Sequence, residues 1–226
     1  MTSKRLLRLL GILISLAFLN GCANGPPATP TMLGEAALAQ GDWRQAKTHF
    51  AEALHIDSKA GRAWLGQAHA QWLGRDPEGS LRSLSSLSKV DRKLFLSEAR
   101  SVYADSLEGA TKGRLRQEKS ELALVSVRAL SKLDPNRRGL APLLGRVLIG
   151  EAERWKWAGD SEKALSFYRE ACVVVPDSLE GWVGAAEILL KRGDGREAMR
   201  LLVVARERHP TAGSIRTLTI QALSLR

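Results

Sequence analysis

Residues 152–176 read AERWKWAGDSEKALSFYREACVVVP, and residues 186–210 read AEILLKRGDGREAMRLLVVARERHP. Within each stretch the apolar residues recur at the spacing of one helix face, and a Gly-Asp pair separates two such runs. Each stretch is therefore predicted to fold as a pair of antiparallel helices joined by a short turn. Six positions match at an offset of 34 residues: Ala152 with Ala186, Gly159 with Gly193, Ala164 with Ala198, Tyr168 with Leu202, Ala171 with Ala205, and Pro176 with Pro210.

The residue types at these positions have a packing explanation. Small side chains such as Ala164 and Ala171 let two helices approach closely, while Tyr168 fills the wider gap between them. The glycine of each Gly-Asp pair is expected to end the first helix, and the proline to end the second.

A 34-residue period with small residues at set places resembles the tetratricopeptide repeat (TPR), a helix-turn-helix unit that stacks into an α-solenoid. The same template fits two blocks nearer the N-terminus. Their matching residues are Leu33, Gly34, Gly41, Ala46, Phe50 and Ala53 in the first block, and Trp64, Ala68, Leu84 and Leu87 in the second.

The middle of the chain departs from the period. Ala123, Val127 and Pro135 fit a second helix, but its partner around residues 96–111 is out of frame. Between Ser58 and Pro135 the chain has nine residues more than two periods need. Between Pro135 and Pro176 the chain has seven residues more than one period needs, which predicts about two extra helical turns near residues 141–158. The stretch 92–120 lacks the small-residue spacing and is expected to be the mobile part of the array.

We therefore predict an all-α fold, a TPR-type α-solenoid of about five repeats over residues 33–226. A closing helix from Gly213 to Leu225 would cover the apolar face of the last repeat. The composition agrees, with 44% hydrophobic and only 5% aromatic residues. Two cysteines exclude a disulfide framework.

The first 21 residues resemble an export signal. Positive charge at residues 4–8 precedes an apolar run over residues 9–19, which is too short to span a bilayer as a helix. The run ends in Leu19-Asn20-Gly21-Cys22, which resembles the bacterial lipobox. The resemblance implies cleavage before Cys22 and attachment of lipid to it. Ordinary signal cleavage at the small residues around Cys22 is the alternative.

Residues 22–32 form the predicted lipidated cysteine and Pro-rich tether, which would hold the repeats roughly 25 Å from the lipid. Ala23 stands where an aspartate would favour inner-membrane retention in enterobacterial-type lipoproteins. That resemblance implies a lipid anchor in the outer membrane of a bacterial cell envelope, facing the periplasm.

No catalytic residue, metal ligand set or cofactor motif is predicted. The four histidines are scattered, and Gly193-Asp194-Gly195 reads as a turn between helices. The formal charge of +10 does not indicate nucleic-acid binding, because acids are interleaved with the basic residues. A small-molecule substrate is not predicted either.

Tetratricopeptide arrays bind a peptide or helix of another protein on a concave surface lined by the first helix of each pair. Trp72 and Trp157 are the expected anchors, although aromatic residues here can instead pack between repeats. The carboxylate-clamp pattern of the family, lysine followed by asparagine four residues later, is absent. Mapping the template onto this sequence gives eleven groove residues: Arg62, Leu65, His69, Trp72, Arg146, Ile149, Glu153, Trp157, Val183, Glu187 and Leu190.

A signal followed by repeats resembles the pilotin and assembly lipoproteins of type IV and Tad pili. The resemblance implies a scaffold whose partners are other envelope proteins, such as a secretin or pilus and secretion components. The alternatives are an adaptor for cell-wall or outer-membrane barrel-assembly machinery and, third, an enzyme with a cryptic site.

Overall fold

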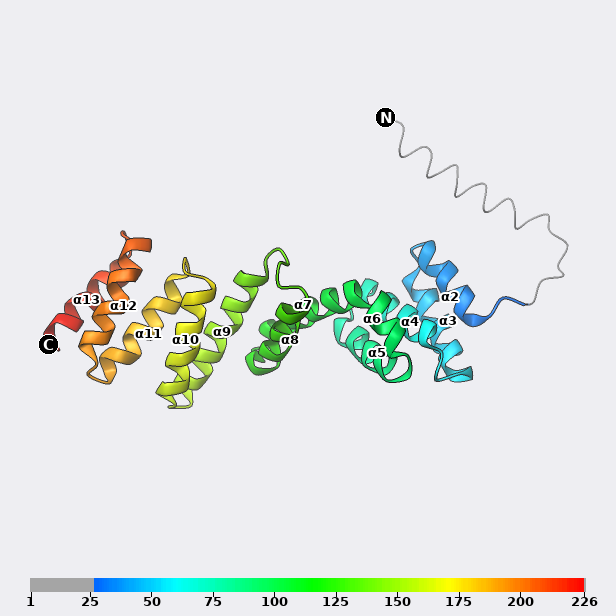
Figure 1. Ribbon diagram of the computed structural model, residues 1–226, viewed down its shortest axis with the longest axis horizontal. Helices are drawn as coiled ribbons and strands as arrows, with labels where there is room; N and C mark the ends of the chain where they lie inside the picture. The colour runs from blue at the N-terminus through cyan, green and yellow to red at the C-terminus, as the bar shows by residue number, and fades with distance from the viewer. Residues whose placement is uncertain (1–26, 226) are drawn as a thin grey trace, which may run out of the picture.

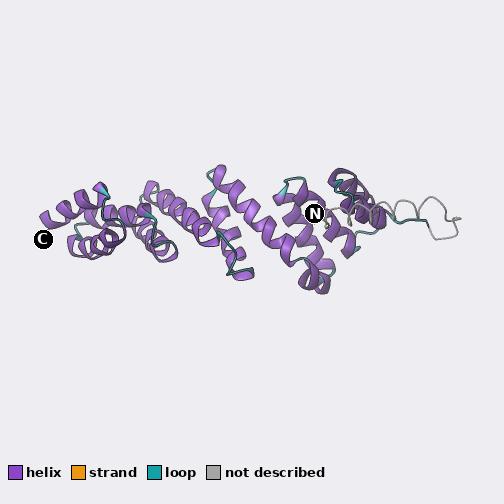
Figure 2. Cartoon of the chain, turned by 90° about the horizontal axis from the view of Figure 1, so that it is seen from above, coloured by secondary structure: helices purple, strands orange, loops and turns teal. Residues whose placement is uncertain are grey.

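The computed structural model describes residues 27–225, so the signal, Cys22 and the first part of the tether lie outside the described residues. Every regular element in that range is a helix, and helix pairs follow one another along an elongated array (Figures 1 and 2). The helices are α2 (Pro30–Ala39), α3 (Trp43–Ile56), α4 (Gly61–Leu73), α5 (Pro77–Val90), α6 (Arg92–Glu98), α7 (Arg100–Arg116), α8 (Ser120–Leu133), α9 (Leu140–Trp157), α10 (Ser161–Val174), α11 (Leu179–Lys191), α12 (Gly195–Arg208) and α13 (Gly213–Ser224).

Ten of these helices form five antiparallel pairs. We call the first helix of each pair its A helix (α2, α4, α7, α9 and α11) and the second its B helix (α3, α5, α8, α10 and α12). Helix α13 packs on α11 and α12 and closes the array at Gly213–Ser224. The predicted all-α, TPR-type solenoid is confirmed.

The turn between the two helices of a pair has one recurring geometry. Gly41, Gly159 and Gly193 each adopt a left-handed backbone with φ near +80°, as expected for a glycine that ends a helix. Arg75 and Glu118 hold the equivalent place in the second and third pairs, with φ of 61° and 57°. In all five turns the following N–H donates to a carbonyl in the last turn of the A helix at 2.9–3.0 Å.

The nine extra residues before the third pair form α6 and its flanks. Consequently α7 begins at Arg100 rather than around residue 96, and its partner α8 follows in the normal frame. Thr111 of α7 is fully buried at the place that Ala68 and Ala152 occupy in their repeats. Its hydroxyl donates to the Leu107 carbonyl oxygen at 2.7 Å, which lets a polar residue occupy a small buried site. The predicted out-of-frame partner is therefore wrong: the insertion lies ahead of the helix.

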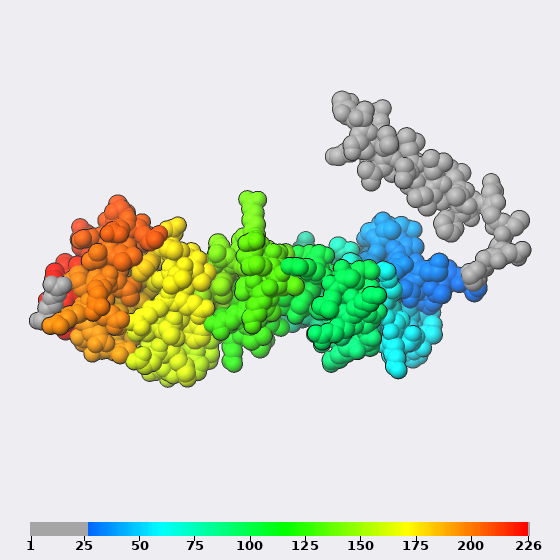
Figure 3. Space-filling model, viewed as in Figure 1, coloured from blue at the N-terminus to red at the C-terminus, as the bar shows by residue number. Residues whose placement is uncertain are grey.

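The seven extra residues before Pro176 are also located. Helix α9 has 18 residues, whereas α4 and α11 have 13 each, so five of the seven extend α9 at its N-terminal end and the other two lie in the loop before it. The extension is about one and a half turns rather than the predicted two. The loop between α8 and α9 projects from one side of the array (Figure 3). At the N-terminus α2 begins at Pro30, three residues before the predicted start of the repeats. Pro30 is preorganised for the first helical position, and the Thr29 hydroxyl accepts from the Met32 N–H at 3.3 Å.

The core runs through the array as consecutive clusters, and two aromatic side chains mark its closest packing. Tyr168 is 1% exposed and lies against Gly184 of the next repeat, where an added Cβ would be 2.4 Å from the ring. Phe50 is fully buried against Gly66 in the same way, at 2.1 Å. The predicted role of Tyr168 as a wedge between helices agrees with this arrangement. No described helix combines the length and apolar character that a bilayer crossing requires.

Candidate partner-binding face

All eleven predicted groove residues lie on the A helices α4, α9 and α11, but they differ greatly in accessibility. Leu65 is 7% exposed and belongs to the core. Trp72 is half-buried, and its ring lies where a Cβ on Gly109 of α7 would be 2.8 Å away. Trp72 therefore packs between the second and third repeats, which was the alternative to its role as an anchor.

Trp157 is the opposite case. It is the last residue of α9, and 88% of its surface is exposed. A large exposed indole is the type of side chain that dominates binding energy when a partner buries it.

An intramolecular ion pair lies in the N-terminal part of the predicted groove. The Arg62 guanidinium donates to both carboxylate oxygens of Glu98 in α6, at 2.9 and 3.2 Å. His69 of α4 is half-buried, and burial lowers its pKa, with Asp105 of α7 acting in the opposite direction. The α6 insertion thus supplies a carboxylate that the sequence template did not place here.

Asp105 and Glu108 of α7 also bind Arg137 from the loop before α9. Arg137 Nε lies 2.6 Å from Glu108 Oε2, and its guanidinium also pairs with Asp105. Burial raises the pKa of Glu108, but hydrogen bonds from Lys112 and Arg137 outweigh it and hold that pKa below its ordinary value. These two carboxylates are therefore already paired within the protein.

Glu153 and Glu187 meet around a lysine that the sequence analysis missed. Lys156 Nζ lies 3.1 Å from Glu187 Oε2 and 3.6 Å from Glu153 Oε1. Burial lowers the pKa of Lys156, but the hydrogen bonds and charges of Glu187 and Glu153 together outweigh burial and raise the pKa above its ordinary value. The Tyr168 hydroxyl donates to Glu153 and joins this cluster to the core.

Arg146 and Ile149 lie together in a hollow of about 460 Å³ between α7, α9 and α11, which we call the central hollow. Its walls are mainly apolar, with one cation and one carboxylate among them. Seven of its nine lining residues were not predicted: Leu115 because the frame of α7 was unknown, and the other six because they lie outside the groove positions of the template. The full lining is Leu115, Pro142, Gly145, Arg146, Ile149, Gly150, Val175, Ser178 and Glu180.

Glu187 and Leu190 line a second hollow of about 530 Å³, the C-terminal hollow, which α11 shares with α13. The predicted Val183 is half-buried on α11 and packs against the core beneath this helix. The central and C-terminal hollows therefore extend along the A-helix side from α7 to α13. The other lining residues are Lys191, Leu218, Gln221, Ser224 and Leu225.

The described residues contain no group of three or more His, Cys, Asp or Glu side chains placed to hold a metal ion. Cys172 is buried, as expected of a small hydrophobe, and burial raises the pKa of its thiol to about 12.

Comparison with known proteins supports the fold. No family model matches the sequence, and the search of curated proteins finds no match. A TPR repeat protein from Bacteroides fragilis superposes with a TM-score of 0.59 at 12% identity, over 89% of this chain and 99% of that one. PilF of Pseudomonas aeruginosa is aligned at 16% identity over 87% and 82% of the two chains, with a TM-score of only 0.39. The first of these likenesses concerns the fold alone, and it identifies this chain as an α-solenoid of tetratricopeptide-type repeats.

Proposed function

We propose that this protein is a lipid-anchored scaffold that binds another envelope protein along the A-helix side of its solenoid, and that it is not an enzyme. The observation that carries the proposal is the pair of hollows that extend from α7 to α13. The central hollow is mainly apolar and the C-terminal hollow mixes leucines with polar side chains, a combination that suits the side chains of a docked helix or extended peptide. Trp157 adds an exposed anchor on α9.

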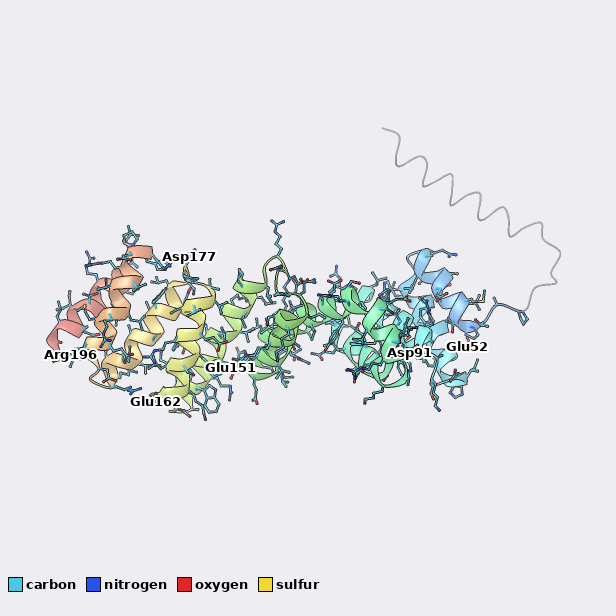
Figure 4. The ribbon with its side chains drawn as sticks, viewed as in Figure 1. Glu52, Asp91, Glu151, Glu162, Asp177 and Arg196 are labelled. Carbon is cyan, nitrogen blue, oxygen red and sulfur yellow. The ribbon has the colours of Figure 1, made fainter. Side chains whose placement is uncertain are left out.

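The scaffold should be tested by photocrosslinking in cells. A benzophenone amino acid at Arg146 or Trp157 should give the same crosslinked envelope protein, because both positions are exposed on α9. The matched control is Arg196, an exposed position on the B helix α12, labelled in Figure 4. Equal crosslinking from all three positions would contradict an assignment to the A-helix side.

Anchoring rests on the Leu-Asn-Gly-Cys sequence before the tether. The mature protein should begin at Cys22 and carry acyl chains, which mass spectrometry of its N-terminus would show. Two or three chains give stable membrane attachment. A Cys22→Ala protein that still fractionated with membranes would remove the basis for the lipid anchor and for outer-membrane localisation.

The finer role that we propose is assembly of a pilus or secretion complex, supported only by the architecture of signal plus repeats. Identification of the crosslinked protein tests it. A secretin or a pilus component supports the proposal, whereas a cell-wall hydrolase or a barrel-assembly protein would assign the scaffold to that machinery.

A further inference from the structure

The α6 insertion helps to form a hollow on the B-helix side of the array. This outer hollow, of about 300 Å³, lies between the B helices α5 and α8 with α6 and α7 behind them. Phe95 of α6 and Tyr103 of α7 stack edge to face in its wall, with ring centroids 5.4 Å apart. The full lining is Leu81, Leu84, Ser85, Ser88, Phe95, Tyr103, Leu107, Arg114, Val125, Ser126 and Ala129.

The only charged group of the lining is already satisfied. Arg114 donates to both carboxylate oxygens of Glu78, at 2.8 and 2.9 Å, and to the Ser126 hydroxyl. The interior therefore offers apolar and aromatic contact rather than a site for an anion. At its lip Val125 is 65% exposed, and Leu122 beside it is 50% exposed.

The equivalent hollow between α10 and α12 shows what is unusual here. That hollow, of about 380 Å³, has Arg169 on one wall and Glu197 on the other, and the two form an ion pair across it. In the repeat frame, Ser85 of α5 and Leu122 of α8 occupy the places of Arg169 and Glu197. Among the described residues no ion pair therefore joins α5 directly to α8 across the outer hollow, and the Arg114–Glu78 pair runs from α7 to α5.

The rim of the outer hollow is basic. Four exposed cations lie next to lining residues along their helices: Arg82 and Lys89 in α5, Arg92 one turn before Phe95, and Lys132 one turn after Ala129. Within the described residues none of the four is within 4.0 Å of a carboxylate oxygen. One exposed carboxylate, Glu121, also lies one turn before Val125 in α8, so the rim carries four cations and one acid.

We propose that the outer hollow docks an acidic amphipathic helix of a partner protein. Large apolar side chains at i and i+4 of that helix enter the hollow, and its flanking carboxylates meet the four rim cations. A volume of about 300 Å³ is at the lower limit of the roughly 300–1,000 Å³ found for cavities that hold whole ligands, and it has room for large side chains. A recessed hollow favours a protein over an anionic membrane, because a flat surface would meet only the rim.

This site lies on the other side of the helix pairs from the face proposed above, and it needs no contribution from it. The scaffold would then hold two partners at once, one on its A helices and one between α5 and α8. The two sites share no residue, so variants separate them.

The test uses the full chain, purified from membranes in detergent, and fluorescence anisotropy of labelled helical peptides. The first peptide carries Phe and Leu at i and i+4, flanked by glutamates. A second peptide has both anchors changed to alanine, and a third has the glutamates changed to lysine. We expect saturable binding of the first peptide, at least tenfold weaker binding of the other two, and weakening by salt.

Two variants address the hollow and two serve as matched controls. Val125→Asp, and Lys89→Glu combined with Lys132→Glu, should each weaken binding at least tenfold while circular dichroism stays unchanged. Val173→Asp, at a 79% exposed place in the equivalent hollow, and Arg146→Glu in the central hollow should leave binding unaltered.

Three outcomes would overturn the proposal. The first is that the glutamate-flanked peptide shows no saturable binding, or that all three peptides bind equally, or that all variants bind the first peptide equally. The second is binding of phosphatidylglycerol vesicles that depends on Lys89 and Lys132 while the acidic peptide does not bind, which would assign the cations to a membrane. The third is a dimer in sedimentation that Val125→Asp dissociates, which would make a second copy of this chain the occupant.

Discussion

The junction between the fourth and fifth repeats differs in chemistry from the junctions in the centre of the array. At the former, the Tyr168 ring lies on Gly184, and the Cys172 sulfur lies where a Cβ on Gly181 would be 3.1 Å away. At the central junctions polar side chains that are buried or partly buried are bonded to one another. The Ser106 hydroxyl donates to Ser80 at 2.8 Å, Arg114 binds Glu78, and the Ser120 hydroxyl donates to Glu151 at 2.6 Å.

Both kinds of junction stack helix pairs in the same fold. A repeat can therefore lack the small-residue sequence pattern and still pack against its neighbours in the same geometry. Apolar contacts between small and aromatic residues recur at a fixed period. Hydrogen-bonded contacts depend on particular donors and acceptors, and each central junction uses a different set. They also respond to pH and to the loss of one partner, which apolar contacts do not.

Tyr168→Ala should show the largest effect. Removing a fully buried aromatic side chain leaves a cavity over Gly184, and the free energy of unfolding should fall by about 3–5 kcal/mol. Urea denaturation followed by circular dichroism measures this. Trp157→Ala, at an 88% exposed site, is the control and should change stability by less than about 0.5 kcal/mol. A small loss at Tyr168 would mean that the apolar junction is not the stronger one.

Glu151→Ala tests the central junction. Glu151, labelled in Figure 4, is 1% exposed and bound by Ser120 and Arg154. Its removal should cost about 2–3 kcal/mol, below the roughly 3–5 kcal/mol for breaking a fully buried pair, because the Arg154 side chain is 39% exposed and can reach water.

Glu151→Leu is the matched variant, because leucine is apolar and close to glutamate in volume. Replacing a buried ion pair by an apolar residue is often neutral, so we expect a change within about 1 kcal/mol of wild type. If the leucine variant were as unstable as the alanine variant, the hydrogen bonds themselves would be the main source of stability at this junction.

Lowering the pH should reduce the stability contributed by the central junction more than that contributed by the junction between the fourth and fifth repeats. Burial raises the pKa of Glu151, but bonds from Arg154 and Ser120 outweigh it, so the folded pKa lies below the ordinary value. Its stabilisation is therefore complete above the unfolded pKa of about 4.3 and is lost as the pH falls through the folded pKa. Each unit of pKa difference contributes about 1.4 kcal/mol.

The measurement is urea denaturation between pH 7 and pH 3. The stability gap between wild type and Glu151→Ala should narrow below pH 4. The gap between wild type and Leu189→Ala, which loses only apolar contacts in the core cluster that contains Tyr168, should stay nearly constant through the acid range. A constant gap for Glu151→Ala would contradict a lowered pKa.

The smallest expected effect concerns the turns. Arg75 and Glu118 hold a left-handed backbone that costs a non-glycine residue about 1–2 kcal/mol, partly offset by the extra freedom of glycine in the unfolded chain. Arg75→Gly and Glu118→Gly should each stabilise by up to about 1 kcal/mol in thermal unfolding. Gly193→Ala, with no atom within 4 Å of an added Cβ, should destabilise by about 1 kcal/mol.

The sequence predicted the fold wherever the small residues recur. Repeats one, two, four and five and the closing helix follow from the period, whereas α6 has only seven residues and no counterpart in the other repeats. The frame of α7 was missed because Thr111 stands for the usual alanine. The sequence pattern does not show that the Thr111 hydroxyl bonds to a carbonyl within its own helix and so can be buried there.

The candidate face was predicted in part for a similar reason. Arg146, Ile149, Glu187 and Leu190 do line hollows on the A-helix side. A position on an A helix does not decide whether a side chain points to solvent or into the neighbouring repeat. Trp72 packs into the neighbouring repeat.

The left-handed turns also bear on the order in which the array assembles. In a linear array, folding can start at any repeat and spread to its neighbours. The hairpins of α9 with α10 and α11 with α12 have glycine at their turns and a tight apolar junction, so we expect them to form the nucleus. The hairpins closed by Arg75 and Glu118 would follow, with α6 enclosed last. The α2–α3 hairpin meets the same criteria, with Gly41 at its turn and Phe50 packed on Gly66, so the array would grow inward from both ends and close at its centre.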